Sequence, residues 1–354
     1  MTVESPKAER VLVAGDPIRG YMRSISAAFQ ACGVASVPLE WQTPKHDPLE
    51  YWKRILSKQY SEKQKRNSRR DNSLAFERAI AKVKPDYAIV VNGVALTDAA
   101  KEECRKNGTK LVHWACDSPV WSPWILEQAK GFDLIYTYEP DDVELFSSLG
   151  PTSCLPLGYD DRLYRPTSPS QSKEIDLCFV GAINRAWTER TGLLQEVAGE
   201  LKGGNVAIWS DTIHYYSPSR LLDLLIIGAG RNLRIRRKEA SHEEINSLYN
   251  RSKICLNIHH QQSRGALNPR TFEILGSGGF LLTDRTLDGV SGFESGKDYW
   301  LYSDADSLTR SIREFLVDDD KRQRIASHGH EIAARYHTYV ARASKILKDL
   351  RDLG

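Results

Sequence analysis

The sequence predicts an α/β protein with two domains, each built on a parallel sheet covered by helices. Short apolar runs alternate with helical patterns along most of the chain. A segment without apolar residues, "RPTSPSQSKE" (165–174), interrupts this alternation, which then begins again. The length of 354 residues is sufficient for two domains of ordinary size.

In the first half, four apolar runs are expected to form buried strands, since such runs are typical of sheets covered on both faces. They are "VLVAG" (11–15), "YAIVVNG" (87–93), "KLVHWAC" (110–116) and "FDLIYTY" (132–138). Helices are expected over 21–32, 98–106 and 141–149. Together these elements form a predicted N-terminal domain over residues 1–165.

The segment 51–85 is long, helical in pattern and rich in Lys and Arg. One interpretation is a solvated helical excursion, and the other is a surface that meets an anionic acceptor or membrane headgroups. The net charge of +3 is too small to indicate a nucleic-acid partner by itself.

A linker is predicted over 166–174, followed by a second domain over 175–330. Its expected strands are 175–183, 206–211, 233–237, 253–259 and 279–284. Its expected helices are 186–201, a helix near Leu221, 241–250 and the helix that begins at Asn268. The repetition on both sides of the linker indicates two Rossmann-like domains that face each other across a cleft. Residues 331–354 should form a helix that packs on one domain or bridges the two.

The composition indicates a soluble globular protein, with 41% hydrophobic and 27% charged residues. The N-terminus has no apolar stretch typical of a signal peptide, and no window approaches the roughly 18 apolar residues of a membrane span. The six Cys have irregular spacing and no metal-type pattern. We therefore expect a cytoplasmic protein.

The helix that begins with "NPRTFEILG" (268–276) carries the main candidate binding residues. Asn268 can cap the helix, and its free N–H groups should lie at the carboxyl edge of the sheet, where they suit a phosphate. The planar guanidinium of Arg270 can donate paired hydrogen bonds to phosphate oxygens. The carboxylate of Glu273 can accept two hydrogen bonds, which suits the paired hydroxyls of a ribose. The alternative is an ordinary Arg–Glu pair on a surface helix.

Several segments resemble one family, the CgeB-like (spore-maturation-type) glycosyltransferases, which are relatives of the retaining GT-B enzymes. The segments are "YNRSKICLNIHHQQSRGALNPRTFEILGSGGFLLTD" (249–284), "DLCFVGAINRAWTERTGLL" (176–194), "LPLGYDDRLYRP" (155–166), "HWACDSP" (113–119) and "IASHGHEIAARYHTYVARASKIL" (325–347). The resemblance extends from about Lys110 onward, and the segments occur in the family's order.

The resemblance implies a GT-B fold with the nucleotide-sugar donor in the C-terminal domain and the acceptor in the N-terminal domain. It implies that Glu273 binds the nucleotide ribose and that Arg270, with the amides of its turn, lies near the diphosphate or the sugar. It also implies that Gly181 lets the backbone approach the phosphates and that Arg190 is a basic phosphate-binding residue. The alternative for Arg190 is a solvated helix residue.

One position departs from the pattern of the retaining relatives. They often carry a Glu eight positions before the ribose-binding Glu, and Gly265 stands there in this chain. Asn268 or the loop 261–267 could supply the missing contact to the sugar. The departure also supports a second hypothesis, a noncatalytic nucleotide- or sugar-binding protein on the same fold.

Two residues of the N-terminal domain are candidates for catalysis. Asp117 follows the strand 110–116 and could act as a base toward an acceptor hydroxyl, or it could be a turn residue before Pro119. His113 lies in the same strand, and the alternative is a core histidine. Of His259 and His260, at most one can face a bound sugar, because neighbouring strand residues point in opposite directions.

The predicted function is metal-independent transfer of a sugar, with retention, from a nucleotide-diphosphate donor, expected to be UDP-linked. No cofactor or metal site is expected, since no Asp-x-Asp stands at a strand end. The acceptor could be a glycan, a protein, a lipid-linked molecule or a nucleic acid. A third hypothesis is a glycosyltransferase that acts on modified DNA bases, which the basic segment 51–85 permits.

Overall fold

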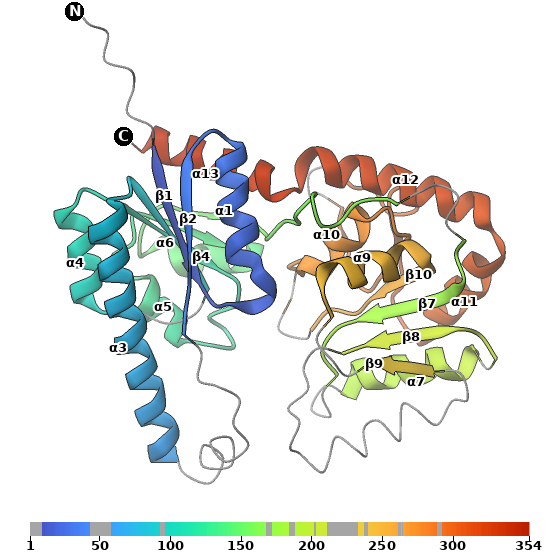
Figure 1. The fold of residues 1–354 in the computed structure, drawn as a ribbon. Helices are drawn as coiled ribbons and strands as arrows, with labels where there is room; N and C mark the ends of the chain where they lie inside the picture. Colours follow the sequence, from blue (N-terminus) through green and yellow to red (C-terminus); the bar gives the residue numbers. More distant parts are fainter. Residues whose placement is uncertain are drawn as a thin grey trace, which may run out of the picture. The chain divides into compact units, whose positions relative to one another are not determined.

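The computed structural model divides the chain into two compact units, shown as ribbons in Figure 1. The first unit contains residues 1–157 and 339–354, and the second contains residues 158–338. The structure describes residues 9–42, 58–92, 96–167, 172–183, 188–201, 203–210, 233–236, 240–260, 263, 265–288 and 292–353. Each unit has its own parallel sheet and its own core, so the predicted α/β fold class with two Rossmann-like units is confirmed.

The sheet of the first unit has the strand order β2-β1-β3-β4-β5-β6, and all its neighbouring strands are parallel. The strands are β1 (Arg10–Gly15), β2 (Ala35–Glu40), β3 (Tyr87–Val91), β4 (Lys110–Ala115), β5 (Leu134–Thr137) and β6 (Thr152–Cys154). Four of them are the predicted strands. The sequence analysis missed β2 and β6, because β2 contains Pro38 and β6 has only three residues. Both lie at an edge of the sheet, where a proline is tolerated.

Helices cover both faces of this sheet. They are α1 (Tyr21–Ala31), α3 (Lys58–Val83), α4 (Asp98–Lys106), α5 (Trp124–Ala129), α6 (Val143–Ser147) and α13 (Tyr339–Asp352), with short 3₁₀ turns η1 (Ile18–Gly20) and η2 (Pro140–Asp142). On one face, Phe29 of α1 and Ile346 of α13 pack with Val11 and Val13. Because strand side chains alternate, Leu12 points to the opposite face, where it packs with α3 and α4.

The basic segment predicted over 51–85 appears as the long helix α3, whose C-terminal half contacts the sheet through Phe76 and Ile80. Residues 51–57 lie outside the described part of the chain. The helical interpretation is therefore confirmed for 58–83. Contact of this helix with an anionic surface stays a prediction.

The sheet of the second unit has the strand order β12-β11-β10-β7-β8-β9 and is also parallel. The strands are β7 (Ile175–Val180), β8 (Val206–Trp209), β9 (Leu233–Arg236), β10 (Ser252–Asn257), β11 (Leu281–Thr283) and β12 (Trp300–Leu301). All five predicted strands of this half are present. The helices are α7 (Thr188–Glu200), α9 (His242–Arg251), α10 (Pro269–Gly276), α11 (Ala305–Val317) and α12 (Asp319–Tyr336). The helix expected near Leu221 lies outside the described residues.

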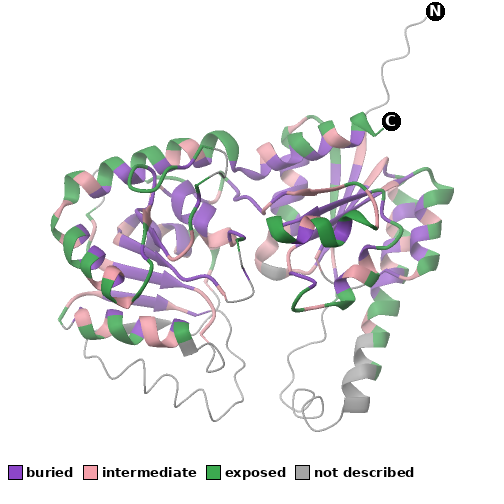
Figure 2. Ribbon diagram, turned by 180° about the vertical axis from the view of Figure 1, so that it is seen from behind, coloured by how far each residue is buried: buried purple, intermediate pink, exposed green. Residues whose placement is uncertain are grey.

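Ser241 and Glu244 form a capping box at the start of α9. Two layers of apolar side chains enclose the second sheet, one with α9 and α10 and the other with α7, α11 and α12. Figure 2 shows that buried residues concentrate on the strands of each unit and on one side of each covering helix. No helix in the described ranges combines the length and the apolar character needed to cross a membrane.

The structure places the division between the units differently from the sequence analysis. The predicted boundary at 165/166 lies inside the second unit, because Tyr159 and Tyr164 are buried in that unit's core. Of the predicted linker 166–174, residues 168–171 lie outside the described part of the chain.

The predicted C-terminal helix 331–354 is two helices that belong to different units. The chain leaves the second unit just after His337, which is 1% exposed and stacks against Phe272 and Phe293 with ring centroids 4.9 Å apart in each pair. The chain then returns to the first unit, where α13 contributes Ile346, Leu347 and Leu350 to the core.

Candidate functional site

The N-terminal end of α10 lies at the carboxyl edge of the second sheet. The Asn268 side chain accepts a hydrogen bond from the Thr271 N–H at 3.2 Å, which makes it the predicted cap, and Pro269 is the first helical residue. The amides of Asn268 and Asn257 are joined by two hydrogen bonds of 3.1 and 3.2 Å. Since Asn257 is the last residue of β10, the end of the strand fixes the start of the helix.

Arg270 and Glu273 are brought together one turn apart, as the sequence predicts. Arg270 Nη1 donates to Glu273 Oε2, and the side chains are 12% and 1% exposed. The pair is therefore buried and is not the surface pair of the alternative interpretation. The helix is buried because Phe272, Ile274 and Leu275 pack in the core. A buried carboxylate needs such a partner, because desolvation of a lone charge is costly.

Arg190 joins the carboxyl ends of two strands. Its Nη1 donates to the Ala182 carbonyl at 2.8 Å, just after β7, and its Nη2 donates to the Ile258 carbonyl at 2.6 Å, just after β10. Arg190 is 9% exposed, and burial lowers its pKa to about 10, so it stays charged at neutral pH. It is not the solvated helix residue of the alternative interpretation. The structure places this cation at the same sheet edge as Asn268.

Gly181 immediately follows β7, and its N–H donates to the Trp209 carbonyl at 2.9 Å. A Cβ at this position would lie 2.8 Å from the ring of Phe179. The close approach of that ring is sufficient reason for a glycine here. A backbone contact of Gly181 with phosphate stays a prediction.

A cluster of buried polar residues lies at this edge. The sequence did not predict that these residues contact one another. His259 Nδ1 lies 2.7 Å from Asp284 Oδ1, and the His259 N–H donates to both Asp284 oxygens at 3.0 and 3.1 Å. The Thr271 hydroxyl lies 3.4 Å from His259 Nε2 and accepts from Asn257 at 3.0 Å. Burial alone would raise the pKa of Asp284, but the hydrogen bonds and charge of His259 leave it lowered.

A sequence signal for this cluster did exist. His259 and Asp284 are the last residues of the predicted strands 253–259 and 279–284, and β10 and β11 are neighbours. The sequence alone, however, does not state that these two strands are adjacent. Of the two candidates His259 and His260, the structure places His259 against the first turn of α10.

In the first unit, Asp117 lies with two further polar residues at the carboxyl edge. Asn92 Nδ2 donates to Asp117 Oδ2 at 2.7 Å, and Asn92 has a φ of 34°. Asp16 follows β1, and burial together with the charge of Asp117 raises its pKa. Since β1, β3 and β4 are neighbours, the strand ends assemble this acidic pair. The sequence analysis did not single out Asp16 or Asn92.

His113 is a core residue, which corrects its place among the catalytic candidates. It lies inside β4, is 2% exposed, and its ring centroid lies 5.1 Å from that of Phe132 and 6.4 Å from that of Phe146. Neither ring nitrogen has a hydrogen-bond partner within the described residues. Burial, with a contribution from Lys101, lowers its pKa to about 4. An uncharged ring inside the sheet layer cannot reach a substrate.

We expect His113 to make the protein less stable in mild acid. The unfolded chain binds a proton near the ordinary pKa of 6.5 and the folded chain only near 4, so the free energy of unfolding falls as the pH is lowered between these values. At pH 5 the loss is about 2 kcal/mol. Urea unfolding at pH 7 and pH 5 measures the effect. The free energy of unfolding should decrease less between these pH values in His113→Leu than in wild type. The exposed His328→Gln is the control, and an unchanged decrease in His113→Leu would contradict the assignment.

Residues 187–348 match the family model described as glycosyl transferase-like. The matched segment covers just under half of the chain. It contains Arg190, Asn268, Arg270 and Glu273, together with the His259–Asp284 pair. A search of curated proteins found no match.

Solved structures show the same two-unit fold over nearly the whole chain. A sucrose-phosphate synthase from Thermosynechococcus elongatus is 13% identical, with a TM-score of 0.70, and the match covers 98% of this chain and 99% of that chain. HepE from Anabaena in complex with UDP-glucose is 14% identical, with a TM-score of 0.64 and coverages of 97% and 99%. These likenesses confirm the predicted GT-B fold.

The same fold also occurs in a protein that is described as part of a phosphatase. The N-terminal domain of a Candida albicans trehalose-6-phosphate phosphatase is 13% identical, with a TM-score of 0.70 and coverages of 98% and 97%. At this level of identity the likeness shows the fold alone, so the activity of this chain must be argued from its own residues.

Proposed function

We propose that this protein is a glycosyltransferase that transfers a sugar from a nucleotide-diphosphate donor, UDP-linked, to an acceptor. The observation that carries the proposal is the buried Glu273 carboxylate, one turn from the capped N-terminal end of α10, within the glycosyl transferase-like part of the chain. The partial positive charge at that helix end suits a diphosphate, and the carboxylate suits ribose hydroxyls. HepE from Anabaena, which shares the fold, was solved with UDP-glucose, and this supports the choice of a UDP-linked donor.

In the proposed reaction, the bond between the sugar and the diphosphate breaks, and negative charge develops on the leaving group. The helix end, Arg270 and the buried charge of Arg190 would stabilise that charge. Glu273 would orient the nucleotide through its ribose, so that the diphosphate meets the helix end. The finer assignment to the CgeB-like group, with retention and without a metal, rests on the sequence motifs.

Incubation with UDP-sugars tests the proposal. An enzyme of this kind should release UDP slowly even without its acceptor, with or without a chelator. Tight UDP binding with neither hydrolysis nor transfer would instead favour the noncatalytic binding protein. Salt-sensitive retention on DNA would favour the hypothesis of a DNA-modifying enzyme.

Asp117→Asn is expected to lower sugar transfer by about a hundredfold or more, while UDP affinity stays unchanged. Asp117 is the proposed base toward the acceptor hydroxyl, and the amide cannot accept a proton. The hydrogen bond from Asn92 and the neighbouring Asp16 place it in a polar cluster rather than in an isolated turn. Asp133→Asn, at the amino edge of the same sheet, is the control. Equal transfer rates in wild type and Asp117→Asn would exclude Asp117 as the base.

A further inference from the structure

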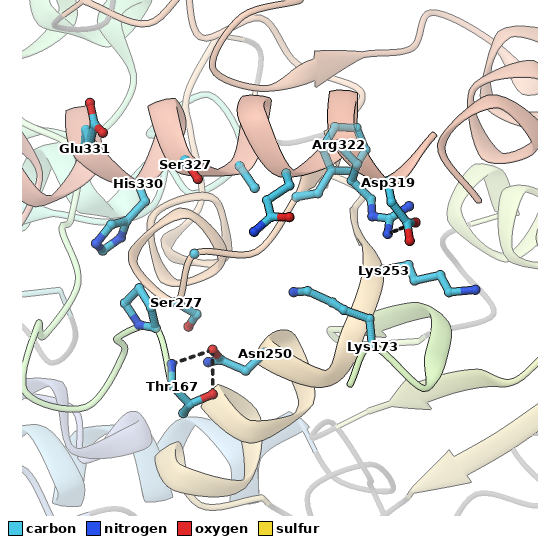
Figure 3. A pocket seen from close by; sticks show the side chains of 15 residues that line it. Thr167, Lys173, Asn250, Lys253, Ser277, Asp319, Arg322, Ser327, His330 and Glu331 are labelled. Carbon is cyan, nitrogen blue, oxygen red and sulfur yellow. Dashed lines mark hydrogen bonds and ion pairs between the residues drawn. The ribbon is translucent and has the colours of Figure 1, made fainter. Parts of the chain in front are cut away.

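A second possible binding site lies in the second unit, at the edge of the sheet opposite to the proposed donor site. It is a cavity of about 530 Å³, shown in Figure 3. Lys173 stands just before β7, Lys253 near the start of β10 and Phe280 just before β11, so the cavity opens at the amino ends of three strands. Asn268 marks the carboxyl end of the same sheet. The size lies within the range of small-molecule sites.

One wall of the cavity is a single stripe of α12. The residues that line it recur at helical spacing: Asp319, Arg322, Gln323, Ala326, Ser327, His330 and Glu331. The opposite wall includes Asn250 of α9, Thr167 and Ser277, which directly follows α10. Hydroxyl and amide groups therefore face basic ones, a combination suited to a ligand with both a negative charge and hydroxyl groups.

The basic residues of the cavity differ in their partners. Lys253 Nζ bonds Asp176 at 2.9 Å, and Arg322 is paired with Asp319 and donates to the Phe315 carbonyl. Lys173 makes no hydrogen bond or ion pair with the described residues. Figure 3 shows its side chain extending into the cavity, whereas that of Lys253 points away.

The environment of Lys173 disfavours a lone ammonium. Burial lowers the pKa of Lys173; of the nearby groups, Cys255 raises it in part and the charge of Arg322 lowers it. Lys173, which has no counter-ion among the described residues, and Arg322, whose side chain is 6% exposed and paired with the exposed Asp319, repel each other. An anion placed between them would relieve this repulsion and supply the missing hydrogen bonds.

We propose that this cavity binds a small phosphorylated polyol, such as a sugar phosphate. The phosphate lies against Lys173 and Arg322, and the hydroxyl groups lie against Gln323 and Ser327. His330 Nδ1 is held by the Leu275 carbonyl at 3.1 Å, which directs the other ring nitrogen away from α10. The proposal is independent of the donor site, since none of its residues is shared with the carboxyl edge.

Calorimetric titration of the full chain with glucose 6-phosphate tests the proposal. Wild type should bind this probe, and Lys173→Met should bind it at least about tenfold more weakly, because a charge-assisted hydrogen bond is lost. Lys297→Met, which removes an exposed lysine outside the cavity, should bind like wild type. Ser327→Trp should abolish binding by filling the cavity, and thermal unfolding should show that each variant is folded.

Three results would overturn the proposal. They are no binding to wild type, unchanged binding in both Lys173→Met and Ser327→Trp, and displacement of the probe by UDP, which would place it in the donor site. Inorganic phosphate serves as the second probe. Equal affinity for inorganic phosphate would contradict the polyol part of the proposal, because the hydroxyl contacts would then contribute nothing.

Discussion

Glu273→Gln is expected to weaken UDP binding by about ten- to a hundredfold, since a hydrogen bond to a charged group contributes about 1.5–3 kcal/mol. The amide keeps the shape of the carboxylate but loses its charge and one acceptor oxygen. Glu273 is 1% exposed, and its charge is balanced by Arg270, so a smaller replacement would leave that guanidinium buried without a partner. Glutamine can still accept a hydrogen bond from Arg270.

The measurement is calorimetric titration with UDP, accompanied by thermal unfolding. Glu294→Gln is the matched control, because Glu294 lies in the same unit but is exposed and, among the described residues, forms an ion pair only with Lys297. UDP that lacks both ribose hydroxyls should bind wild type and Glu273→Gln with the same affinity. If UDP affinity is the same in wild type and in folded Glu273→Gln, the ribose assignment is wrong.

Gly329→Ala is expected to lower the free energy of unfolding. Overpacking costs about 1–3 kcal/mol, and the loss here should lie at the upper end of that range. A Cβ on Gly329 would lie 2.1 Å from the Asp298 carbonyl oxygen and 2.8 Å from Leu275 Cδ2. Both neighbours are buried, and one is backbone, so α12 would have to move away from α10. The gain in helix propensity from alanine, about 1 kcal/mol, is too small to offset this.

Gly192→Ala is the matched control, and its expected effect on stability has the opposite sign. Gly192 lies inside α7, and a Cβ there would meet no atom within 4 Å. The substitution should therefore raise stability by about 0.5–1 kcal/mol. Urea unfolding, followed by circular dichroism, measures both variants. Equal stability of Gly329→Ala and wild type would show that α12 does not approach Asp298 as closely as described.

The strands were the most predictable part of the fold. "VLVAG" (11–15), "IDLCFVGAI" (175–183) and "KICLNIH" (253–259) could be identified because buried parallel strands need continuous apolar runs. The N-terminal end of α10 was also predictable, since Asn268 and Pro269 are local signals that act within one turn. The edge strand β2 was missed, because its Pro38 and its exposed residues do not follow the buried pattern.

The site was predictable only where one element contains it. Arg270 and Glu273 belong to one helix, and their spacing alone brings them together. His259 and Asp284, or Asp16 and Asp117, come together because strands that are separate in sequence lie close together in a sheet. The same applies to His113, whose place in the core depends on Phe132 and Phe146 from later segments.

The sequence by itself determined the α/β class, the two parallel sheets and the capped helix with its charged pair, because local periodicity and capping set these features. Only the tertiary structure decided that Arg190 joins two strand ends, that His337 packs in the core near the end of the second unit and that α13 returns to the first. These features depend on which strands and helices pack side by side. Burial then decides which of the polar residues are held in the core and which can meet a ligand.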